Sequence, residues 1–344
     1  MKNSATPLRL WIAVFFLSIT PLVNSQNSVS FVDQINKPAP SSRFNPLFPF
    51  ALTQAGAVDL SQTDPDTVAS VPTWEEMLDR NRNSYRLQSV FLNNDVFALY
   101  GKPGAKNMGV LGQYSIEDLE PIMNDYIKLY DDANGARGII PAFYIIFGTC
   151  WPEGEIGILS DATIMKYIEF ARVHGWYVFL DHQIGKYSVE SAMKRLLPYL
   201  KYPNVQLALD PEWRTTKPME EIGYITAEEL NGAQKMMQDY MMEHSLPGRR
   251  MLVVHQFKPK MISNREKVRS DYELVQLIHC ADGFGSPTLK KSTYALNAAA
   301  TNIPLKSFKL FTKPTIEGAG YDVPIMSPAD VFQLNPRPYL IMYQ

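Results

Sequence analysis

Residues 205–213 read Val205-Gln206-Leu207-Ala208-Leu209-Asp210-Pro211-Glu212-Trp213. The stretch opens as an apolar run interrupted only by Gln206, which is typical of a strand buried on both faces in a parallel sheet. It ends in two carboxylates separated by a proline, and proline cannot donate to a sheet ladder, so the strand should end there. Side chains two apart in extended chain point to the same side, so we expect Asp210 and Glu212 to face one space. The plainer alternatives are a helix N-cap or pairing of these acids with Arg214.

The same strand pattern recurs along the chain and alternates with helical patterns. Strands are predicted at 95–100, 138–147, 176–180, 205–209, 250–254, 274–280, 306–311 and 338–342. Helices are predicted between them at 115–130, 161–174, 188–200 and 226–244, with a short one at 263–269 and others from 286 and 327. Eight such units over roughly 250 residues favour an α/β fold of the closed (β/α)8 TIM-barrel type. An open doubly wound sheet is the second choice, but no glycine fingerprint follows the first strand, so a dinucleotide-binding fold has no support.

Composition sets further limits on function. The chain has 344 residues, 46% hydrophobic and 20% charged, with a formal net charge of −2. This balance argues against a nucleic-acid partner held by a basic surface. The chain has two cysteines, Cys150 and Cys280. They lie at the carboxyl ends of the second and sixth predicted strands, which are on opposite sides of the predicted barrel and too far apart for a disulfide. We therefore expect two free, buried thiols.

The N-terminus carries a predicted export signal. Lys2 and Arg9 precede the apolar run Leu10 to Ile19, and small or modest residues follow before Gln26. This is typical of a cleaved signal peptide at 1–25 and predicts a secreted or periplasmic protein with no membrane span after cleavage; the alternative is an uncleaved anchor. Residues 26–85 are rich in Pro, Ser, Asn and Thr and predict an irregular arm or linker, with the barrel at 86–344.

Four acids lie at the predicted carboxyl ends of strands, where barrel enzymes place their active sites. We expect the catalytic residues to be Glu212, Asp210, Asp181 and Asp282. Glycoside cleavage needs one carboxyl kept protonated and another ionised, and crowding of acids separates their pKa values. Glu212, beside Trp213, is the candidate general acid, and Asp210 polarises it or orients the substrate. Asp181 or Asp282 is the candidate nucleophile or base, although both also suit plain capping and turn roles.

Other polar and aromatic side chains at the same rim are candidate substrate-binding residues. They are Tyr100, Lys102, Trp151, Gln183, Trp213, His255, Gln256, Phe284 and Gln344. We expect Tyr100, His255 and Gln256 to hold sugar hydroxyls. Trp151, Trp213 and Phe284 offer flat faces for pyranose rings. Lys102 equally suits a plain loop charge, and His279, in an apolar strand, a core histidine.

Several short stretches together resemble a known group of proteins. Tyr100-Gly101-Lys102-Pro103-Gly104, residues 178–185 (VFLDHQIG), 207–213 (LALDPEW), 254–257 (VHQF) and 282–285 (DGFG) are similar to a family of secreted bacterial TIM-barrel proteins and lipoproteins of unassigned activity. The resemblance covers Val96 to Gln344 and implies export and a barrel, but no reaction. The lipobox cysteine of the lipoprotein members is missing here, so a lipid anchor is not implied.

The D-x-E at 210–212 is also distantly similar to that of barrel glycosidases of the muramidase and chitinase groups. There the glutamate is the proton donor, which implies this role for Glu212. The chitinase pattern has further aspartates ahead of the glutamate, where this sequence has Gln206 and Ala208. N-acetyl-sugar substrates are therefore not implied.

Three hypotheses follow. The first is an exported glycoside hydrolase-like enzyme that acts on a polysaccharide or cell-wall glycan by carboxylate acid–base chemistry, without a metal or other cofactor. The second is a metal-dependent hydrolase of phosphodiesters or acyl groups, with oxygen and nitrogen ligands drawn from Asp181, Asp210, Glu212, His255, His279 and Asp282. The third is a non-catalytic, glycan-binding barrel.

Overall fold

The computed structural model describes residues 89–314 and 317–344, together with Thr73 and Glu75. The predicted signal (1–25) and, apart from those two residues, the arm (26–85) lie outside the described residues, so both assignments stay predictions. None of the described helices is both long enough and apolar enough to cross a bilayer.

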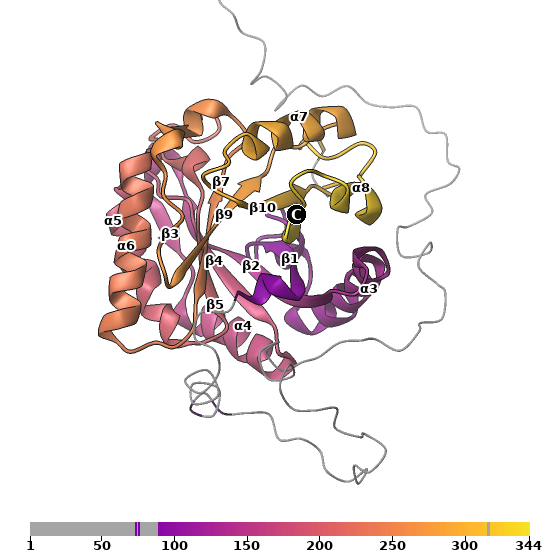
Figure 1. Ribbon diagram of the computed structural model, residues 1–344, viewed down its shortest axis with the longest axis horizontal. Helices are drawn as coiled ribbons and strands as arrows, with labels where there is room; N and C mark the ends of the chain where they lie inside the picture. The colour runs from indigo at the N-terminus through magenta and orange to yellow at the C-terminus, as the bar shows by residue number, and fades with distance from the viewer. Residues whose placement is uncertain (1–72, 74, 76–88, 315–316) are drawn as a thin grey trace, which may run out of the picture.

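Eight parallel strands close into a barrel, which confirms the predicted fold class (Figure 1). They are β1 (Asn94–Gly101), β2 (Gly138–Cys150), β4 (Tyr177–His182), β5 (Val205–Leu209), β7 (Arg250–His255), β9 (Val275–Ala281), β10 (Leu305–Leu310) and β11 (Leu340–Tyr343). The ring closes because β1 pairs with β2 on one side and with β11 on the other. A short strand, β3 (Ile156–Ile158), adds an antiparallel partner to the end of β2.

The main helices follow the strands in sequence and surround them (Figure 1). They are α3 (Ile116–Asn134), α4 (Asp161–His174), α5 (Val189–Leu196), α6 (Ala227–Glu243), α7 (Pro287–Ala298) and α8 (Pro328–Phe332), with one turn at α2 (Val110–Gln113). A Ser or Thr side chain caps the N-terminus of each of α3 to α8. Such caps satisfy backbone N–H groups that have no partner in the first turn.

The short helix expected at 263–269 is wrong. Residues Ile262–Ser263 form β8, which pairs with β6 (Ile225–Thr226) in a separate two-stranded parallel sheet. Asn264 then takes a left-handed conformation with φ of 55°, and only a 3-10 turn, η9 (Arg265–Lys267), follows. A left-handed residue cannot continue a right-handed helix, which explains the break.

Two apolar layers follow from the alternation of side chains along each strand. The outer layer joins strands to helices and includes Phe143, Leu207 and Leu252. The inner layer fills the barrel and includes Val96, Ala208 and other small, branched or aromatic side chains. Residues of the inner-layer parity that lie at the carboxyl ends of the strands are therefore aimed into the barrel mouth.

Both cysteines are free and buried, as predicted. Cys150 ends β2 and Cys280 lies in β9, and these strands are four places apart in the ring of eight, on opposite sides. The expected separation thus follows from strand order.

Candidate active site

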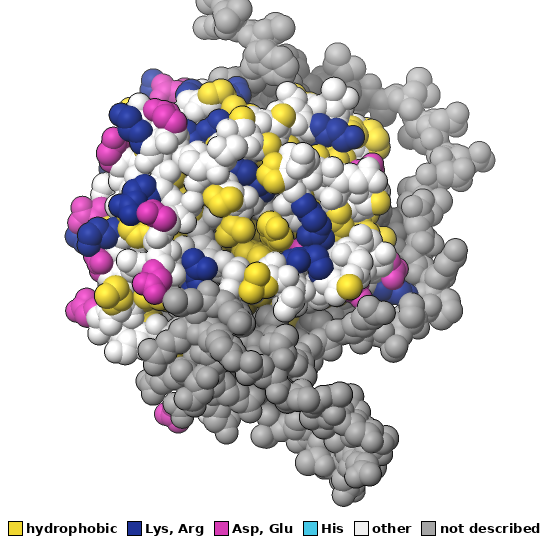
Figure 2. All heavy atoms as spheres, viewed as in Figure 1, with side chains coloured by type: hydrophobic (Ala, Val, Ile, Leu, Met, Phe, Trp, Pro, Cys, Tyr) yellow, Lys and Arg dark blue, Asp and Glu magenta, His cyan; other side chains and the backbone are white. Residues whose placement is uncertain are grey.

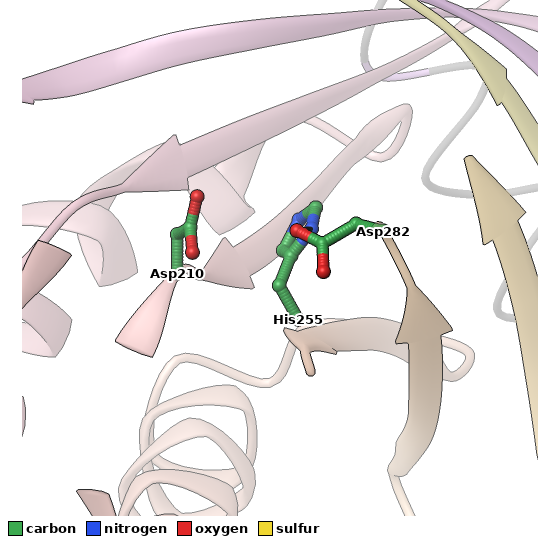
Figure 3. Close-up of side chains that lie close together, drawn as sticks. All are labelled: Asp210, His255 and Asp282. Atoms are coloured by element: carbon green, nitrogen blue, oxygen red, sulfur yellow. Dashed lines mark hydrogen bonds and ion pairs between the residues drawn. The ribbon is translucent and has the colours of Figure 1, made fainter. Parts of the chain in front are cut away.

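A polar cluster fills the carboxyl end of the barrel. Its members, here called the inner cluster, are Tyr100 (β1), Tyr144 (β2), Asp181 (β4), Asp210 (after β5), His255 (β7), Asp282 (after β9) and Lys309 (β10). All have the inner-layer parity of their strands. Figure 3 shows the Asp282 carboxylate against the His255 ring, with Asp210 on the other side. The barrel therefore brings three of the four predicted catalytic acids to one place.

His255 is the centre of the cluster's hydrogen bonds. Its Nδ1 lies 3.0 Å from Asp282 Oδ2, and its Nε2 lies 2.7 Å from the Tyr144 hydroxyl. Asp181 Oδ2 is 3.8 Å from Nε2 and accepts a 3.1 Å hydrogen bond from the Tyr100 hydroxyl. These contacts fix the orientation of the imidazole between two carboxylates.

Lys309 contributes a cation to the same space. Its Nζ lies 3.6 Å from the centroid of the Tyr100 ring, a close cation–π contact. Among the described residues, no carboxylate oxygen lies within 4.0 Å of this Nζ. Lys309 is 3% exposed, so it is a buried cation without an ion pair.

The depth of the acids differs. Asp181, Asp210 and Asp282 are buried, and each has one carboxylate oxygen that is sealed from solvent and has no hydrogen-bond partner in the described chain. Glu212 is half-buried. Neither carboxylate oxygen of Glu212 nor Oδ2 of Asp210 is among these sealed atoms, so the acids at the end of β5 touch solvent-accessible space.

Burial and crowding give the acids at β5 unusual protonation. Burial, with the nearby Asp181 and Asp282 carboxylates, raises the pKa of Asp210 to about 7 against the opposing effect of His255. Burial, then the charges of Asp210 and Asp282, raises the pKa of Glu212 to about 8. Both groups are therefore able to carry a proton near neutral pH.

On the other side of the inner cluster, the pKa values of Asp282 and His255 favour their charged forms. Burial alone would raise the pKa of Asp282, but the hydrogen bond and charge of His255 lower it below the usual aspartate value. Burial opposes the imidazolium of His255, yet Cys280, Asp181 and the bond to Asp282 raise its pKa well above the usual value. Burial raises the pKa of Asp181. The cluster thus combines protonated and ionised carboxyls.

Glu212 reaches this region by a different route from the one expected. After Asp210 the chain leaves the extended conformation and forms a 3-10 turn, η7 (Pro211–Trp213). The alternation of side chains along a strand, from which we expected Asp210 and Glu212 to face one space, therefore does not apply to this pair. The two carboxyls are nevertheless near enough for the charge of Asp210 to raise the pKa of Glu212.

The three aromatic residues predicted to stack on sugar rings are less buried than the inner cluster. Trp151 is 48% exposed and Phe284 53% exposed, and Trp213 is half-buried. The Lys102 Nζ lies 4.8 Å from the Trp151 ring centroid, and the Phe284 ring packs edge-on against Phe311 at 5.9 Å. Exposed, edge-held rings of this kind suit stacking on a ligand.

Two predicted binding residues, Gln256 and Gln183, have side chains that are held by other parts of the described chain. The Gln256 side chain faces out of the barrel, where it donates to two backbone carbonyls and accepts from Arg265 and His279. Gln183 Oε1 accepts from the Cys150 backbone N–H at 2.7 Å. Gln344 differs from these two: it follows β11 with the parity of the inner-layer residues Leu340 and Met342, so its half-buried side chain is aimed toward the barrel mouth.

Two members of the inner cluster were missed by the sequence reasoning. Tyr144 lies within the apolar run of β2, where nothing marks it. Lys309 had a usable signal: Lys306 and Lys309 are three apart in one strand, so they must face opposite sides. Lys306 bonds to backbone carbonyls outside the barrel, which leaves Lys309 inside.

Asp210, His255 and Asp282 also have the composition of a cation site. One donor atom from each lies within 4.8 Å of the others, and all three residues are buried. Imidazole and carboxylate ligands suit first-row divalent metals. If a metal bound here, the His255 imidazole and the carboxylates of Asp210 and Asp282 would hold it, and it would supply Lewis-acid activation of a water or substrate oxygen.

Comparisons with known proteins find the architecture but no family. No family model and no curated protein matches the chain. Among solved structures, it is similar to the Ostrinia furnacalis Group IV chitinase bound to allosamidin (11% identity, TM-score 0.45, 73% of this chain and 92% of that one). A Flavobacterium johnsoniae GH18 chitinase (10%, 0.42, 73% and 87%) and an oxaloacetate acetylhydrolase bound to oxalate (9%, 0.42, 73% and 75%) are similar to the same degree. These are distant likenesses of the barrel, and they include unrelated chemistries.

Proposed function

We propose that the protein is an exported hydrolase that cleaves glycosidic bonds in a polysaccharide or cell-wall glycan. The observation that carries the proposal is the convergence of Asp181, Asp210 and Asp282 around His255 at one end of the barrel. The pKa values of Asp210 and Glu212 are raised to about 7 and about 8, while Asp282 in the same cluster has a lowered pKa. A protonated acid beside an ionised carboxylate is the pair that glycoside hydrolysis requires.

Roles follow from depth and protonation. Glu212 is the proton donor to the leaving oxygen, because its carboxyl is the most accessible of the four. Asp282 is the ionised carboxylate, held in place by His255, and acts as nucleophile or as base for a water. Asp210, when it is ionised, raises the pKa of Glu212 by its negative charge, and Asp181 orients Tyr100 by accepting a hydrogen bond from its hydroxyl. Trp151, Trp213 and Phe284 supply stacking faces for sugar rings at the margin.

The test is reducing-end release from a panel of glycans. Glu212→Gln keeps the shape of the side chain but cannot deliver a proton, so turnover should fall by about a hundredfold or more while the melting temperature does not fall. Glu229→Gln, in the N-terminal turn of α6, is a control whose side chain pairs with Arg214. A Glu212→Gln variant with full activity would remove the proposal.

A metal-dependent hydrolase is the second candidate, favoured by the convergence of Asp210, His255 and Asp282. The two candidates differ in their response to a chelator. Glycosidase chemistry by carboxyls alone predicts equal activity before and after dialysis against EDTA. Loss of activity on dialysis, with recovery on adding one divalent metal, would favour the metal-dependent reaction.

A further inference from the structure

Lys309 is the group in the inner cluster that the proposed reaction leaves without a role. It is 3% exposed, and burying a cation is costly unless it is paired. Asp181, Asp210 and Asp282 all lie nearby, yet none has an oxygen within 4.0 Å of the Lys309 ammonium. The contacts of the Lys309 Nζ in the described chain are with aromatic rings: it lies 3.6 Å from the centroid of Tyr100 and 5.1 Å from that of Phe311.

The ammonium is nevertheless within reach of a ligand. The sealed polar atoms that lack a partner include none from Lys309, so its Nζ touches solvent-accessible space. Strand parity aims it toward the barrel mouth, beside the carboxyls of the inner cluster. A buried, unpaired and accessible cation has the properties of an anion-binding group.

Two further lysines border the same sector of the rim. Lys102 follows β1 and Lys313 follows β10, and both strands neighbour β11 in the ring. Among the described residues, neither lysine has a carboxylate partner within 4.0 Å. On the face shown in Figure 2, Lys and Arg side chains lie beside the central apolar patch, and most Asp and Glu side chains lie toward the margin of the molecule.

The charge of the cluster permits an anion to enter. Asp282 is balanced by His255 at 3.0 Å. Asp181 accepts a hydrogen bond from the Tyr100 hydroxyl and lies 3.8 Å from His255 Nε2. Both carboxylates are thus engaged by other groups, which leaves the Lys309 ammonium available to an anion.

We propose that Lys309 binds an anionic substituent of the substrate, so that the glycan is an acidic one, carrying a uronate carboxylate or a sulfate. This inference deepens the proposed function and rests on it. Lys309 is then a specificity-determining residue: its ammonium forms a charge-assisted hydrogen bond with the anionic group, and the Tyr100 ring beneath it holds it in position.

Binding measurements on the Glu212→Gln chain test this without turnover. The probes are trimers of galacturonate, glucuronate and mannuronate, the fully methyl-esterified form of each, and a neutral trisaccharide with and without one sulfate. We expect at least one acidic probe to bind about 10- to 100-fold more tightly than its uncharged counterpart, the worth of one hydrogen bond to a charged group. The ester comparison identifies a carboxylate, and the sulfate comparison a sulfate.

Adding Lys309→Met should abolish that preference and leave the affinity for the uncharged form unchanged. Lys309→Arg keeps the cation and should keep a preference, and Lys313→Met is the matched control at the exposed rim, with a smaller effect. Melting temperatures confirm that each variant is folded. Equal affinity for acidic and uncharged probes, failure of every acidic probe to bind, or a preference that survives Lys309→Met would overturn the inference. Cleavage of a neutral glycan that depends on Glu212 would overturn it while leaving the proposed function in place.

Discussion

His255 Nδ1 and Asp282 Oδ2 lie 3.0 Å apart at the ends of the adjacent strands β7 and β9, both buried. This pair sets the charge of the whole inner cluster. The pairing lowers the pKa of Asp282 and raises that of His255. The carboxyls with raised pKa values, Asp210 and Glu212, lie at the end of β5 instead.

Asp282→Asn should lower the pKa of His255, although Cys280 and Asp181 continue to raise it. Without the carboxylate, burial disfavours the imidazolium, so the pKa of His255 should fall, as a titration of its ring resonances by NMR would measure. Removing one partner of a buried pair should also cost about 3–5 kcal/mol of unfolding free energy. Asp271→Asn breaks an exposed pair with Arg269 and should cost less than about 1 kcal/mol. Equal losses in the two variants would contradict the role of this pair.

Tyr144→Phe removes only the hydroxyl that lies 2.7 Å from His255 Nε2. The ring keeps its stacking on Phe179 at 5.0 Å, so we expect a cost of about 1–3 kcal/mol from the unpaired nitrogen, together with reduced turnover. Tyr130→Phe is the matched control, because its hydroxyl bonds to Tyr343 in the outer layer. That variant should lose stability but keep its activity, and equal activity in both would count against Tyr144.

Asp210 and Glu212 should each contribute stability that is lost as pH rises from about 5 to 8, whereas His182 and His279, whose pKa values burial lowers, should act in the opposite direction below about pH 6.5. The pKa values of Asp210 and Glu212, about 7 and about 8 in the folded chain, lie above those of unfolded carboxyls, so the folded state binds more protons in this window. His255, with its raised pKa, acts in the same direction. In urea unfolding across this range, the stability of Glu212→Gln relative to the parent should increase with pH, and that of Glu243→Gln on α6 should stay constant. A constant difference between Glu212→Gln and the parent would be inconsistent with a raised pKa of Glu212.

The Lys290–Asp322 pair should stabilise the loops around Asp282. Its Nζ and Oδ2 lie 3.2 Å apart, each side chain 1% exposed, and Lys290 also donates to the Gly283 carbonyl. Lys290→Met leaves a buried carboxylate unpaired and should cost about 3–5 kcal/mol. Lys290→Met with Asp322→Leu should recover part of this in chemical unfolding, although the amides of Gly285 and Phe311 then lose their acceptor. A double variant as unstable as the single one would show that the instability of Lys290→Met does not come from an unpaired Asp322 carboxylate.

The fold was readable from the sequence because most strands are local apolar runs and each main helix has a local cap. The predicted strand 205–209 has the same bounds as β5. The error at 263–269 has a non-local cause: Ile262 and Ser263 pair with residues 225–226 on another loop, and no local pattern carries that information.

The site was readable only in part. His255 and Gln256 were both expected to bind substrate, but neighbours in a strand face opposite sides, so a single barrel mouth can receive only one of them. The same rule would have marked Lys309. Tyr144 could not be found, because its role depends on the ring position of β2 relative to β7, which the closed barrel decides.

The most direct test of the central claim is the titration of the Glu212 side chain, followed by carbon NMR of labelled glutamate, with Glu212→Gln to assign the resonance. We predict a pKa of about 8, so that Glu212 is protonated and able to act as an acid at neutral pH. A pKa below about 5, near that of an ordinary glutamate, would contradict the proposed role of Glu212 as proton donor.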